Sequence, residues 1–528
     1  MNWDYIVIGA GSAGCALAYE LANSGQNATV LVVEAGGSDR SPFIRFPAGQ
    51  IRAIGRHDWG YRSQPDSSRN GTTERWFRGR VLGGSSSING TMYVRGSAED
   101  FNRWAAQCGQ AAGWSANEVM PIYRELESSD QPGPHRGRTG PLHVRTVRRP
   151  HAMTEAFIAA TCACGYPFNE DYNGEVQEGV AYAQLSQRNG LRCSAADAFL
   201  KPLLGKKNIK LLLNATAHKI TFSNSRAVGI AFLHNRKMRS ETAREIVVCA
   251  GAIDSPKLLM MSGVGDSEEL RRHNIDVVVD LPGVGRNLKE HPLLKLTYRT
   301  TIPTYNFTEG LLQKLGVAAE FLKHREGPIS NLFEGAAFLK SSLSEPGPDI
   351  QLHFLPIGYL TTSDGTIEFA PYPSVTVILN KSYPKSSGRI RLAGNDPDDP
   401  PLIECRLLDD ESDVETLVQG VEAIRRIMKT EPIAHLIDAE MAPGPDMESI
   451  PALRDYVRSH TEIAFHPAGT CRMGTGGDAV VGPNLRVHGT DHLWVADASI
   501  MPDLISGNTN AACMMIGAKL GRQLATAR

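Results

Sequence analysis

The start of the chain carries a glycine pattern whose spacing suits the binding of a dinucleotide. The residues follow the G-x-G-x-x-G spacing as Gly9-Ala10-Gly11-Ser12-Ala13-Gly14. In this pattern the first glycine permits a tight turn, the second lets the backbone approach a pyrophosphate, and the third lets a helix pack closely on a strand. The free N–H groups at the start of that helix would then face the phosphate charge.

The glycine pattern has this meaning only when a strand precedes it and a helix follows it. Both are predicted, because Tyr5–Ile8 is an apolar strand-like run, a helix is expected to about Asn23, and Thr29–Val33 is a second strand. Glu34 ends that second strand, where a carboxylate can accept hydrogen bonds from the ribose hydroxyls of adenosine. A carboxylate there would repel a 2′-phosphate and disfavours NADP. A plain glycine-rich turn is the alternative, and the pattern alone does not separate FAD from NAD.

Farther along the chain, strand and helix patterns predict two structural units of different kinds. Strand patterns occur at Ile209–Leu213, Ile220–Phe222, Ala227–Phe232, Glu245–Cys249, Pro348–Leu355, Ser374–Leu379 and Gly388–Leu392. Helical patterns occur at Ser115–Leu126, Ala152–Cys164, Leu311–His324, Ser412–Thr430 and Ile450–His460. The strands at Pro348–Leu355, Ser374–Leu379 and Gly388–Leu392 are expected to form antiparallel sheet. In the last two, which are expected as a pair, apolar and polar residues alternate. The predicted fold is α/β (α+β overall): a Rossmann-like dinucleotide-binding domain and a second domain with an antiparallel sheet flanked by helices.

Composition excludes several classes of function. The 528 residues are too many for one hydrophobic core. A net charge of −2 does not indicate the basic surface that nucleic-acid binding requires. No apolar run approaches the roughly 20 residues of a membrane-spanning helix. Met1-Asn2-Trp3 leads directly into the first strand, so no secretory signal is expected. The nine cysteines are odd in number and scattered without C-x-x-C, and no His/Cys cluster has metal-ligand spacing. We therefore expect a cytoplasmic protein without a metal.

Long motifs in the chain resemble the signatures of the glucose–methanol–choline (GMC) oxidoreductases. They are Gly79–Gly96, Gly251–Gly265 and Leu281–Leu288, together with a C-terminal region from His466 to Asn510. The resemblance spans nearly the whole chain, and within the family it is strongest to bacterial choline-dehydrogenase-like members, with pyridoxine oxidases nearby. It implies FAD as the cofactor. On this basis we expect a discontinuous FAD-binding domain of residues 1–155, 200–295 and 465–528, and a substrate-binding domain of residues 156–199 and 296–464.

Together the glycine pattern and the resemblance give a set of residues expected to bind FAD. At the phosphates and adenosine these are Gly9, Gly11, Ser12, Ala13, Gly14, Glu34, Ala35 and the backbone of His218. Toward the flavin they are Trp59, Leu82, Gly84, Asn89, Gly90, Thr91, Met92, Asp497, Ala498 and Thr509. A Ser/Gly surface loop is the alternative for the Gly83–Asn89 segment, and a core position is the alternative for Trp59.

Ile88 departs from the pattern of family members that tether FAD covalently. Those members often use a His at this place in the flavin loop, whereas an alkyl side chain cannot attack the flavin's 8-methyl carbon. The sequence therefore predicts a non-covalently bound FAD.

His466 and Asn508 match the family's catalytic pair. His466 follows a helical segment that ends near His460, and Pro467 favours an extended backbone at the histidine. The reaction would remove a proton from the alcohol oxygen and a hydride from its carbon, the hydride going to flavin N5. A neutral imidazole can take the proton. Asn508 can donate an amide N–H to the alcohol oxygen and support developing alkoxide charge.

The resemblance implies oxidation of an alcohol to the aldehyde. Phe465 and the apolar residues beside it favour a primary alcohol that is aromatic or otherwise apolar, with core packing as the alternative for these residues. A non-redox lyase of the same fold, a choline-type dehydrogenase with a quinone acceptor, and a non-catalytic FAD-binding protein are the alternatives. The substrate pocket is expected to draw on His353, Phe354, Leu355, Leu379, Ala464 and Phe465. The sequence leaves open which alcohol reacts and whether O₂ or a quinone or dye accepts the electrons.

Overall fold

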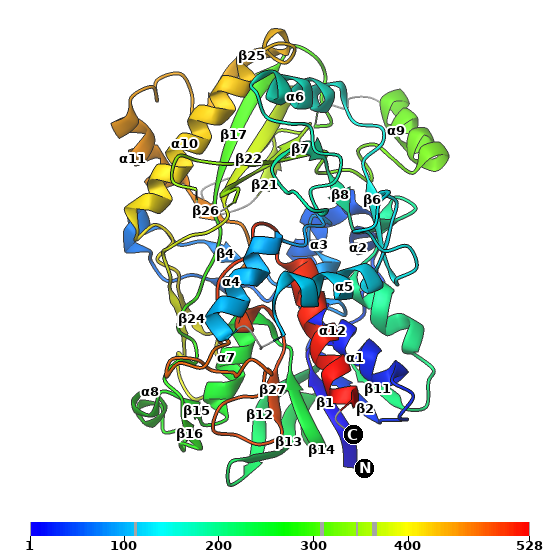
Figure 1. Cartoon of the computed structure of the whole chain (residues 1–528), viewed down its shortest axis with the longest axis vertical. Helices are drawn as coiled ribbons and strands as arrows, with labels where there is room; N and C mark the ends of the chain where they lie inside the picture. The colour runs from blue at the N-terminus through cyan, green and yellow to red at the C-terminus, as the bar shows by residue number, and fades with distance from the viewer. Residues whose placement is uncertain (1, 110–112, 307–310, 345–346, 362–366, 527–528) are drawn as a thin grey trace.

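The computed structural model describes residues 2–109, 113–306, 311–344, 347–361 and 367–526. Two large sheets lie in opposite halves of the molecule, one in the lower and one in the upper half of Figure 1. The first strand and the last helix are neighbours, since the Tyr5 hydroxyl donates to the Leu524 carbonyl at 3.1 Å. The predicted α/β class is confirmed.

The first sheet consists mainly of parallel strands, with the N-terminal strand near its centre. Its order is β11-β2-β1-β14-β13-β12, and β27 also pairs with β14. β1 pairs in parallel with β2 and β14, whereas β13 runs antiparallel to its two neighbours. The strands are β1 (Asn2–Ile8), β2 (Val30–Val33), β11 (Ile209–Leu212), β12 (Ala215–Ser223), β13 (Arg226–His234), β14 (Lys237–Val248) and β27 (Leu493–Val495).

Helices cover this sheet because its central strands are apolar on both faces. All residues of β2 are buried, as expected for a parallel strand between helical layers. α1 (Ser12–Asn23) begins at the glycine turn, and α12 (Asn510–Thr526) packs against it. At Gly517 of α12, an added Cβ would lie 2.1 Å from the Ala13 carbonyl oxygen, so only glycine permits this approach. The two ends of the chain therefore meet beside the glycine turn.

The second sheet is antiparallel. Its order is β25-β17-β22-β19-β18-β7, with β26 also paired to β17. The strands are β7 (Gly179–Tyr182), β17 (Pro292–Thr300), β18 (Gly335–Leu339), β19 (Ile350–Leu355), β22 (Ser374–Lys381), β25 (Ile437–Ala442) and β26 (Glu462–Ile463). Of these, the sequence patterns predicted β19 and β22 and missed the others. The predicted strand at Gly388–Leu392 is β23 (Arg389–Arg391), which pairs with β24 (Leu402–Glu404) in a separate sheet and not with β22.

The two faces of the second sheet have different partners. Side chains on one face pack under α6 (Ala152–Ala163) and α10 (Glu411–Met428), and they include Leu294, Leu352, Phe354, Val377 and Leu379. The strand register puts Leu293, Lys295, His353, Ile378 and Asn380 on the opposite face, toward a cavity. Every residue of β22 is buried, because neither face of this strand is open to bulk solvent.

The other predicted helices are present as α5 (Ala116–Leu126), α9 (Leu311–His324) and α11 (Ile450–His460). The predicted division into FAD-binding and substrate-binding domains stays a prediction. Two of its expected boundaries, at residues 155 and 295, fall inside α6 and β17.

Candidate active site

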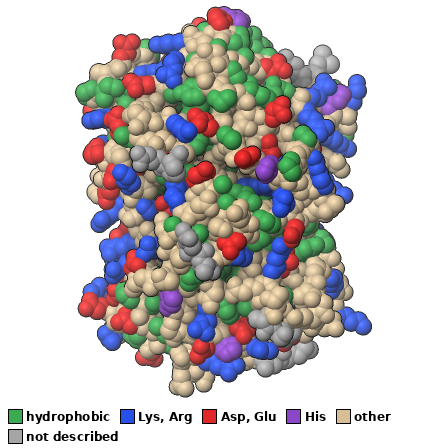
Figure 2. All heavy atoms as spheres, in the orientation of Figure 1, with side chains coloured by type: hydrophobic (Ala, Val, Ile, Leu, Met, Phe, Trp, Pro, Cys, Tyr) green, Lys and Arg blue, Asp and Glu red, His purple; other side chains and the backbone are tan. Residues whose placement is uncertain are grey.

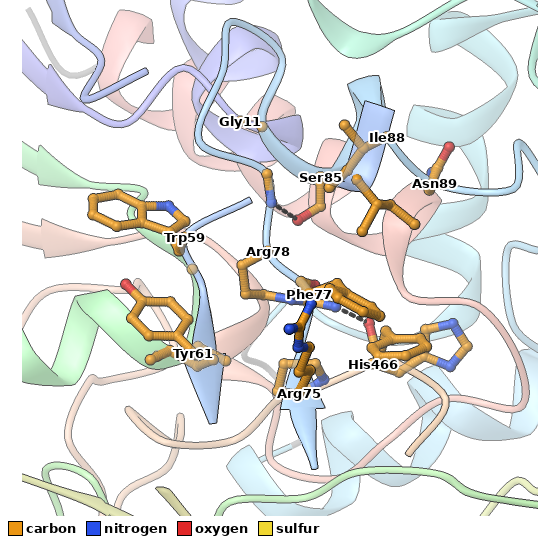
Figure 3. A pocket seen from close by; sticks show the side chains of 18 of the residues that line it. Gly11, Trp59, Tyr61, Arg75, Phe77, Arg78, Ser85, Ile88, Asn89 and His466 are labelled. Carbon is orange, nitrogen blue, oxygen red and sulfur yellow. Dashed lines mark hydrogen bonds between the residues drawn. The ribbon is translucent and has the colours of Figure 1, made fainter. Parts of the chain in front are cut away.

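A cavity of about 1010 Å³ extends from the glycine turn after β1 to the inner face of the second sheet. Residues of both sheets line it, among them Ile8 and Val33 of the first and Leu293 and Ile378 of the second. Figure 3 shows part of its wall, with Gly11 at one end of the view and His466 at the other. The cavity therefore brings the N-terminal turn and the C-terminal histidine into one site.

The turn end of the cavity is lined by backbone. Gly11 is the N-cap of α1, no side chain caps the first N–H groups of this helix, and its first turn contains no acidic residue. Gly84 approaches the same turn so closely that a Cβ there would lie 2.8 Å from the Gly11 Cα. Ser12 does not cap the helix, because its hydroxyl donates to Asn510 Oδ1 at 2.7 Å. An uncapped helix N-terminus with glycine on both sides suits a phosphate group.

Glu34 lies at the end of β2 and lines the cavity. One carboxylate oxygen accepts the Ala10 N–H at 2.8 Å and the other accepts the Gly36 N–H at 2.7 Å. Burial raises the pKa of Glu34 to about 7, and the two backbone donors act in the opposite direction. Each oxygen keeps a further lone pair, so the carboxylate can also accept from hydroxyl groups in the cavity.

The side wall carries a pair of stacked aromatic rings. Trp59 and Tyr61 stack with ring centroids 5.8 Å apart, and the Arg80 guanidinium lies 4.6 Å from the Trp59 ring. The Tyr61 hydroxyl donates to the partly buried Asp254 carboxylate at 2.7 Å. Figure 3 shows Trp59 and Tyr61 side by side on this wall. Trp59 thus lines the cavity, and its contact with the cofactor stays a prediction.

At the far end of the cavity, His466 faces Asn508. The distance from Asn508 Nδ2 to His466 Nε2 is 3.0 Å. Burial lowers the pKa of His466 well below its usual value, and His291, His353 and Arg78 add to this effect. The imidazole is therefore neutral at physiological pH, as a general base requires.

The backbone around His466 is fixed from two sides. Phe465 has a φ of 64°, an unfavourable value for a bulky residue that neighbouring bonds must hold. The His466 N–H donates to the Glu290 carboxylate at 2.7 Å, and the Arg78 guanidinium donates to the Phe465 carbonyl. Burial raises the pKa of Glu290 to about 8, and Arg78 acts in the opposite direction. Figure 3 shows Arg78, from the segment that follows β4 (Arg75–Trp76), reaching toward the His466 loop.

Most of the predicted site residues line this cavity. They are Gly9, Gly11, Ser12, Ala13, Glu34, Ala35, Trp59, Gly84, Asn89, Gly90, Met92, His218, His466, Asp497, Ala498, Asn508 and Thr509. Gly14, Leu82 and Thr91 lie behind the lining. Gly14 packs against the Gly9 carbonyl, Leu82 is in the first core, and Thr91 Oγ1 accepts from Gln187.

The predicted substrate pocket needs a correction at two residues. His353, Leu355, Ala464 and Phe465 line the cavity, but Phe354 and Leu379 do not. Both belong to the core under α6 and α10, because successive residues of a strand point to opposite faces.

The sequence analysis did not predict four residues around the His466–Asn508 pair, namely Arg78, Glu290, His291 and Gln351. Glu290 and His291 follow the Leu281–Leu288 motif after one intervening residue, and Arg78 directly precedes the Gly79–Gly96 motif. Their adjacency to long motifs was the available signal, but no spacing rule gave their contacts.

The GMC oxidoreductase family models match residues 3–293 and 384–517 of the chain. The "Oxygen-dependent choline dehydrogenase" of Rhizobium meliloti (strain 1021) is 40% identical over 539 residues, covering 99% of this chain and 96% of the relative. That of Brucella suis biovar 1 is 38% identical and covers 98% and 95%. Among solved structures, pyridoxine 4-oxidase from Mesorbium loti superposes with a TM-score of 0.89 at 29% identity, covering 99% of both chains.

Formate oxidase from Aspergillus oryzae RIB40 has the same fold, with a TM-score of 0.91 at 24% identity over 100% of this chain and 98% of that one. The chain belongs to the GMC oxidoreductase family. It is therefore an FAD-dependent enzyme that oxidises CH–OH groups.

The cavity fits FAD in three respects. The uncapped N-terminus of α1 suits a pyrophosphate, the Glu34 carboxylate suits ribose hydroxyls, and glycine at 11 and 84 leaves room for close backbone approach. Asp497 supports the adjoining turn, since its carboxylate accepts from the Gly251 N–H at 2.8 Å and from the Ser255 hydroxyl at 2.6 Å.

In the part of the chain that the structure describes, no helix is long and apolar enough to cross a membrane. The same residues contain no group of three or more His, Cys, Asp or Glu side chains that could hold a metal ion.

Proposed function

We propose that this enzyme oxidises a primary alcohol, aromatic or otherwise apolar, to the aldehyde, with His466 as the general base. The observation that carries the proposal is a neutral imidazole in the cavity, held against the Asn508 amide at 3.0 Å. FAD, when bound, supplies the acceptor for the hydride at flavin N5. When the alcohol hydroxyl replaces the Asn508 amide as the donor to His466 Nε2, this nitrogen takes the hydroxyl proton as the alcohol carbon loses its hydride.

Asn508 would orient the alcohol. One of its two amide hydrogens points to His466 Nε2, so the second is available to the alcohol oxygen. A donor aimed at that oxygen stabilises the negative charge that develops as the proton leaves. His466 as the base and Asn508 as the donor then both act on the hydroxyl group of the alcohol.

An apolar cluster beside His466 supports the assignment of an apolar alcohol. The cluster contains Leu293, Leu355, Ile357, Ile378 and Ala464, with Phe333 and Tyr359 packed against it. Burial of the substrate's apolar part there would contribute about 25 cal/mol per Å². Lys295 projects from the same sheet face and pairs with Glu462 at 2.6 Å.

A choline-type dehydrogenase is the second candidate, because curated relatives at 38–40% identity carry that name. The rings of Phe333 and Tyr359 could meet a quaternary ammonium group. Against this, the Lys295 ammonium already lies 5.3 Å from the Tyr359 ring and pairs with the Glu462 carboxylate, so this ring and this carboxylate already contact a cation. We therefore favour the uncharged alcohol.

A panel of alcohols mixed anaerobically with the enzyme tests the proposal. Benzyl-type and aliphatic primary alcohols should bleach the flavin absorbance faster than choline at equal concentration. No bleaching by any alcohol would overturn the redox assignment and favour a lyase. Faster bleaching by choline would transfer the assignment to the choline-type enzyme.

The electron acceptor is tested with the same alcohols in air. Peroxide formation identifies an oxidase, and reduction of a quinone or dye without peroxide identifies a dehydrogenase. The name of the relatives supports O₂ as the first acceptor to test. We also propose a cytoplasmic location, which the nine free thiols support.

A further inference from the structure

We propose that His291 is a positioning residue that sets the tautomer of His466 through a bond between the two Nδ1 atoms. The inference rests on the proposed role of His466 as the base. His291 directly precedes β17 and is fully buried, and its Nδ1 lies 3.0 Å from Nδ1 of His466. The two rings meet edge to face, with centroids 5.2 Å apart at 83°.

The other nitrogen of His291 has a partner that can only accept. His291 Nε2 lies 2.9 Å from the carbonyl oxygen of Ser382, so Nε2 must carry a hydrogen. Ser382 is held in place at the end of β22, because its own N–H donates to the Asp349 carbonyl at 2.8 Å. Burial lowers the pKa of His291 to about 4, with the Ser382 and Ile505 carbonyls acting in the opposite direction. A neutral His291 therefore has a bare lone pair on Nδ1.

That lone pair determines the hydrogen on His466. Two bare nitrogens 3.0 Å apart would repel, so His466 must carry its hydrogen on Nδ1 and donate it to His291. A neutral imidazole has one ring hydrogen, and His466 Nε2 is then the unprotonated atom. This is the nitrogen that faces Asn508 and the cavity.

The same donor-to-acceptor direction continues in the hydrogen bonds on the Nε2 side of His466. Asn508 donates from Nδ2 to His466 Nε2, and its Oδ1 accepts from Gln351 Nε2 at 3.3 Å. Gln351 is buried on β19. Reversing any one amide or ring would put two donors or two lone pairs face to face. One backbone carbonyl thus sets the direction of four consecutive hydrogen bonds.

The arrangement also serves the protonated state of the base. When His466 takes the substrate proton, its Nδ1–H keeps an acceptor in His291, and the new charge is shared along that bond. Without His291, the Nε2–H tautomer of His466 would become accessible, and this form cannot accept a proton at the cavity.

Two substitutions at position 291 test the role with the FAD-loaded enzyme. His291→Leu removes the acceptor at similar size, whereas the amide oxygen of His291→Asn can occupy the place of Nδ1 and accept from His466. We expect His291→Leu to lower the limiting rate of anaerobic flavin reduction about 10- to 100-fold. The alcohol concentration at half-maximal rate should change little. His291→Asn should recover most of the rate. His488→Leu is the control, because His488 also bonds a backbone carbonyl, that of Gly474, but lies outside the cavity.

Nitrogen-15 NMR of histidine-labelled oxidised enzyme gives a readout that needs no substrate. The His466 signals, identified by their loss in His466→Gln, should show a protonated Nδ1 and a bare Nε2 in the parent and in His291→Asn. In His291→Leu, the Nε2–H form should appear. A protonated Nε2 in the parent would overturn the proposal. So would a parental rate in His291→Leu, or equal losses in the Leu and Asn variants at full FAD content. If no alcohol reduces the flavin, the proposed function fails, while the NMR result still decides the tautomer.

Discussion

At the scale of single residues, His466 differs from the other histidines in its surroundings. Glu290 fixes its backbone, Asn508 bonds its Nε2, and the cavity gives that nitrogen access to a substrate. None of these contacts is local in sequence, yet all converge on one imidazole. At this scale we expect His466 to determine the rate of the reaction and Ile88 to leave FAD without a covalent link.

Replacing the base should abolish most of the chemistry while the cofactor stays bound. We expect His466→Ala to lower flavin reduction by several orders of magnitude, because base catalysis contributes about 10²- to 10⁴-fold and alignment is lost as well. Asn508→Ala should be milder, since the base remains. Stopped-flow reduction under anaerobic conditions measures both. A parental rate in His466→Ala at full FAD content would refute the assignment.

The pH dependence of flavin reduction follows from the lowered pKa of His466. A base works in its neutral form, and a lowered pKa keeps the imidazole neutral down to more acidic pH. The reduction rate should therefore stay constant as pH falls through 6.5 and decline only below that value. Stopped-flow rates between pH 5 and 9 check this. An acid limb centred above pH 7 would contradict the neutral state described here.

Ile88 supports non-covalent FAD. It is buried at the edge of the cavity and packs with Ile44, Ala53 and Val81, so it offers no nucleophile there. Precipitation of the enzyme with acid should release all flavin into the supernatant, as measured by absorbance. Yellow colour that stays with the washed pellet would show a covalent link.

At the scale of elements, the sequence was most informative where structure is local. The turn from Gly9 to Gly14 and the strand that ends at Glu34 could be predicted because adjacent residues determine them. β17 could not, since its residues pair with residues of β22 and β25 that lie 75 or more positions away in the chain. Likewise, the motif near His291 could not reveal the contacts of this residue, whose Nε2 bonds a carbonyl 91 residues away. Phe354 and Leu379 were misassigned because the face of a strand depends on its pairing register.

The approach of Gly84 to the α1 turn gives an element-scale prediction. In Gly84→Ala, the new Cβ would lie 2.8 Å from the Gly11 Cα, and the residue has a φ of 54°. Either the turn at Gly84 or the turn at Gly11 must move to make room. We therefore expect the Kd for FAD to rise about tenfold or more, which corresponds to a loss of about 1.4 kcal/mol of binding free energy for each factor of ten. Titration of the apoprotein with FAD measures the Kd. Gly25→Ala is the matched control, because it also has a positive φ but no atom within 4 Å of the added Cβ. An unchanged Kd in Gly84→Ala would argue against this contact.

At the scale of the whole molecule, the cavity is lined by both sheets, so the cofactor and the substrate would be held by residues from both. The lower sheet contributes the turn and Glu34, and the upper sheet contributes the apolar face around Leu293 and Ile378. Calorimetry can test whether the predicted FAD-binding and substrate-binding domains unfold together or separately.

Removal of FAD should lower the unfolding temperature. A ligand at 100 times its Kd stabilises the folded state by about 2.7 kcal/mol. Calorimetry of the apoprotein with and without added FAD measures the shift, and a single transition that moves as a whole would indicate that both sheets unfold together. EDTA is the control and should leave the transition unchanged, because the described residues form no metal-binding group. An FAD-independent melting temperature would contradict the cavity as the cofactor site.

The packing of α12 on α1 has a consequence for biosynthesis. α1 leaves the ribosome long before the helix that covers it, because the Ser12 partner Asn510, at the start of α12, lies 498 residues farther along the chain. During translation the glycine turn lacks its cover, and the exposed side of α1 is open to wrong contacts. We therefore expect stable cofactor loading only after α12 has been made. Expression hosts with ample chaperone and riboflavin supply should therefore yield more active enzyme.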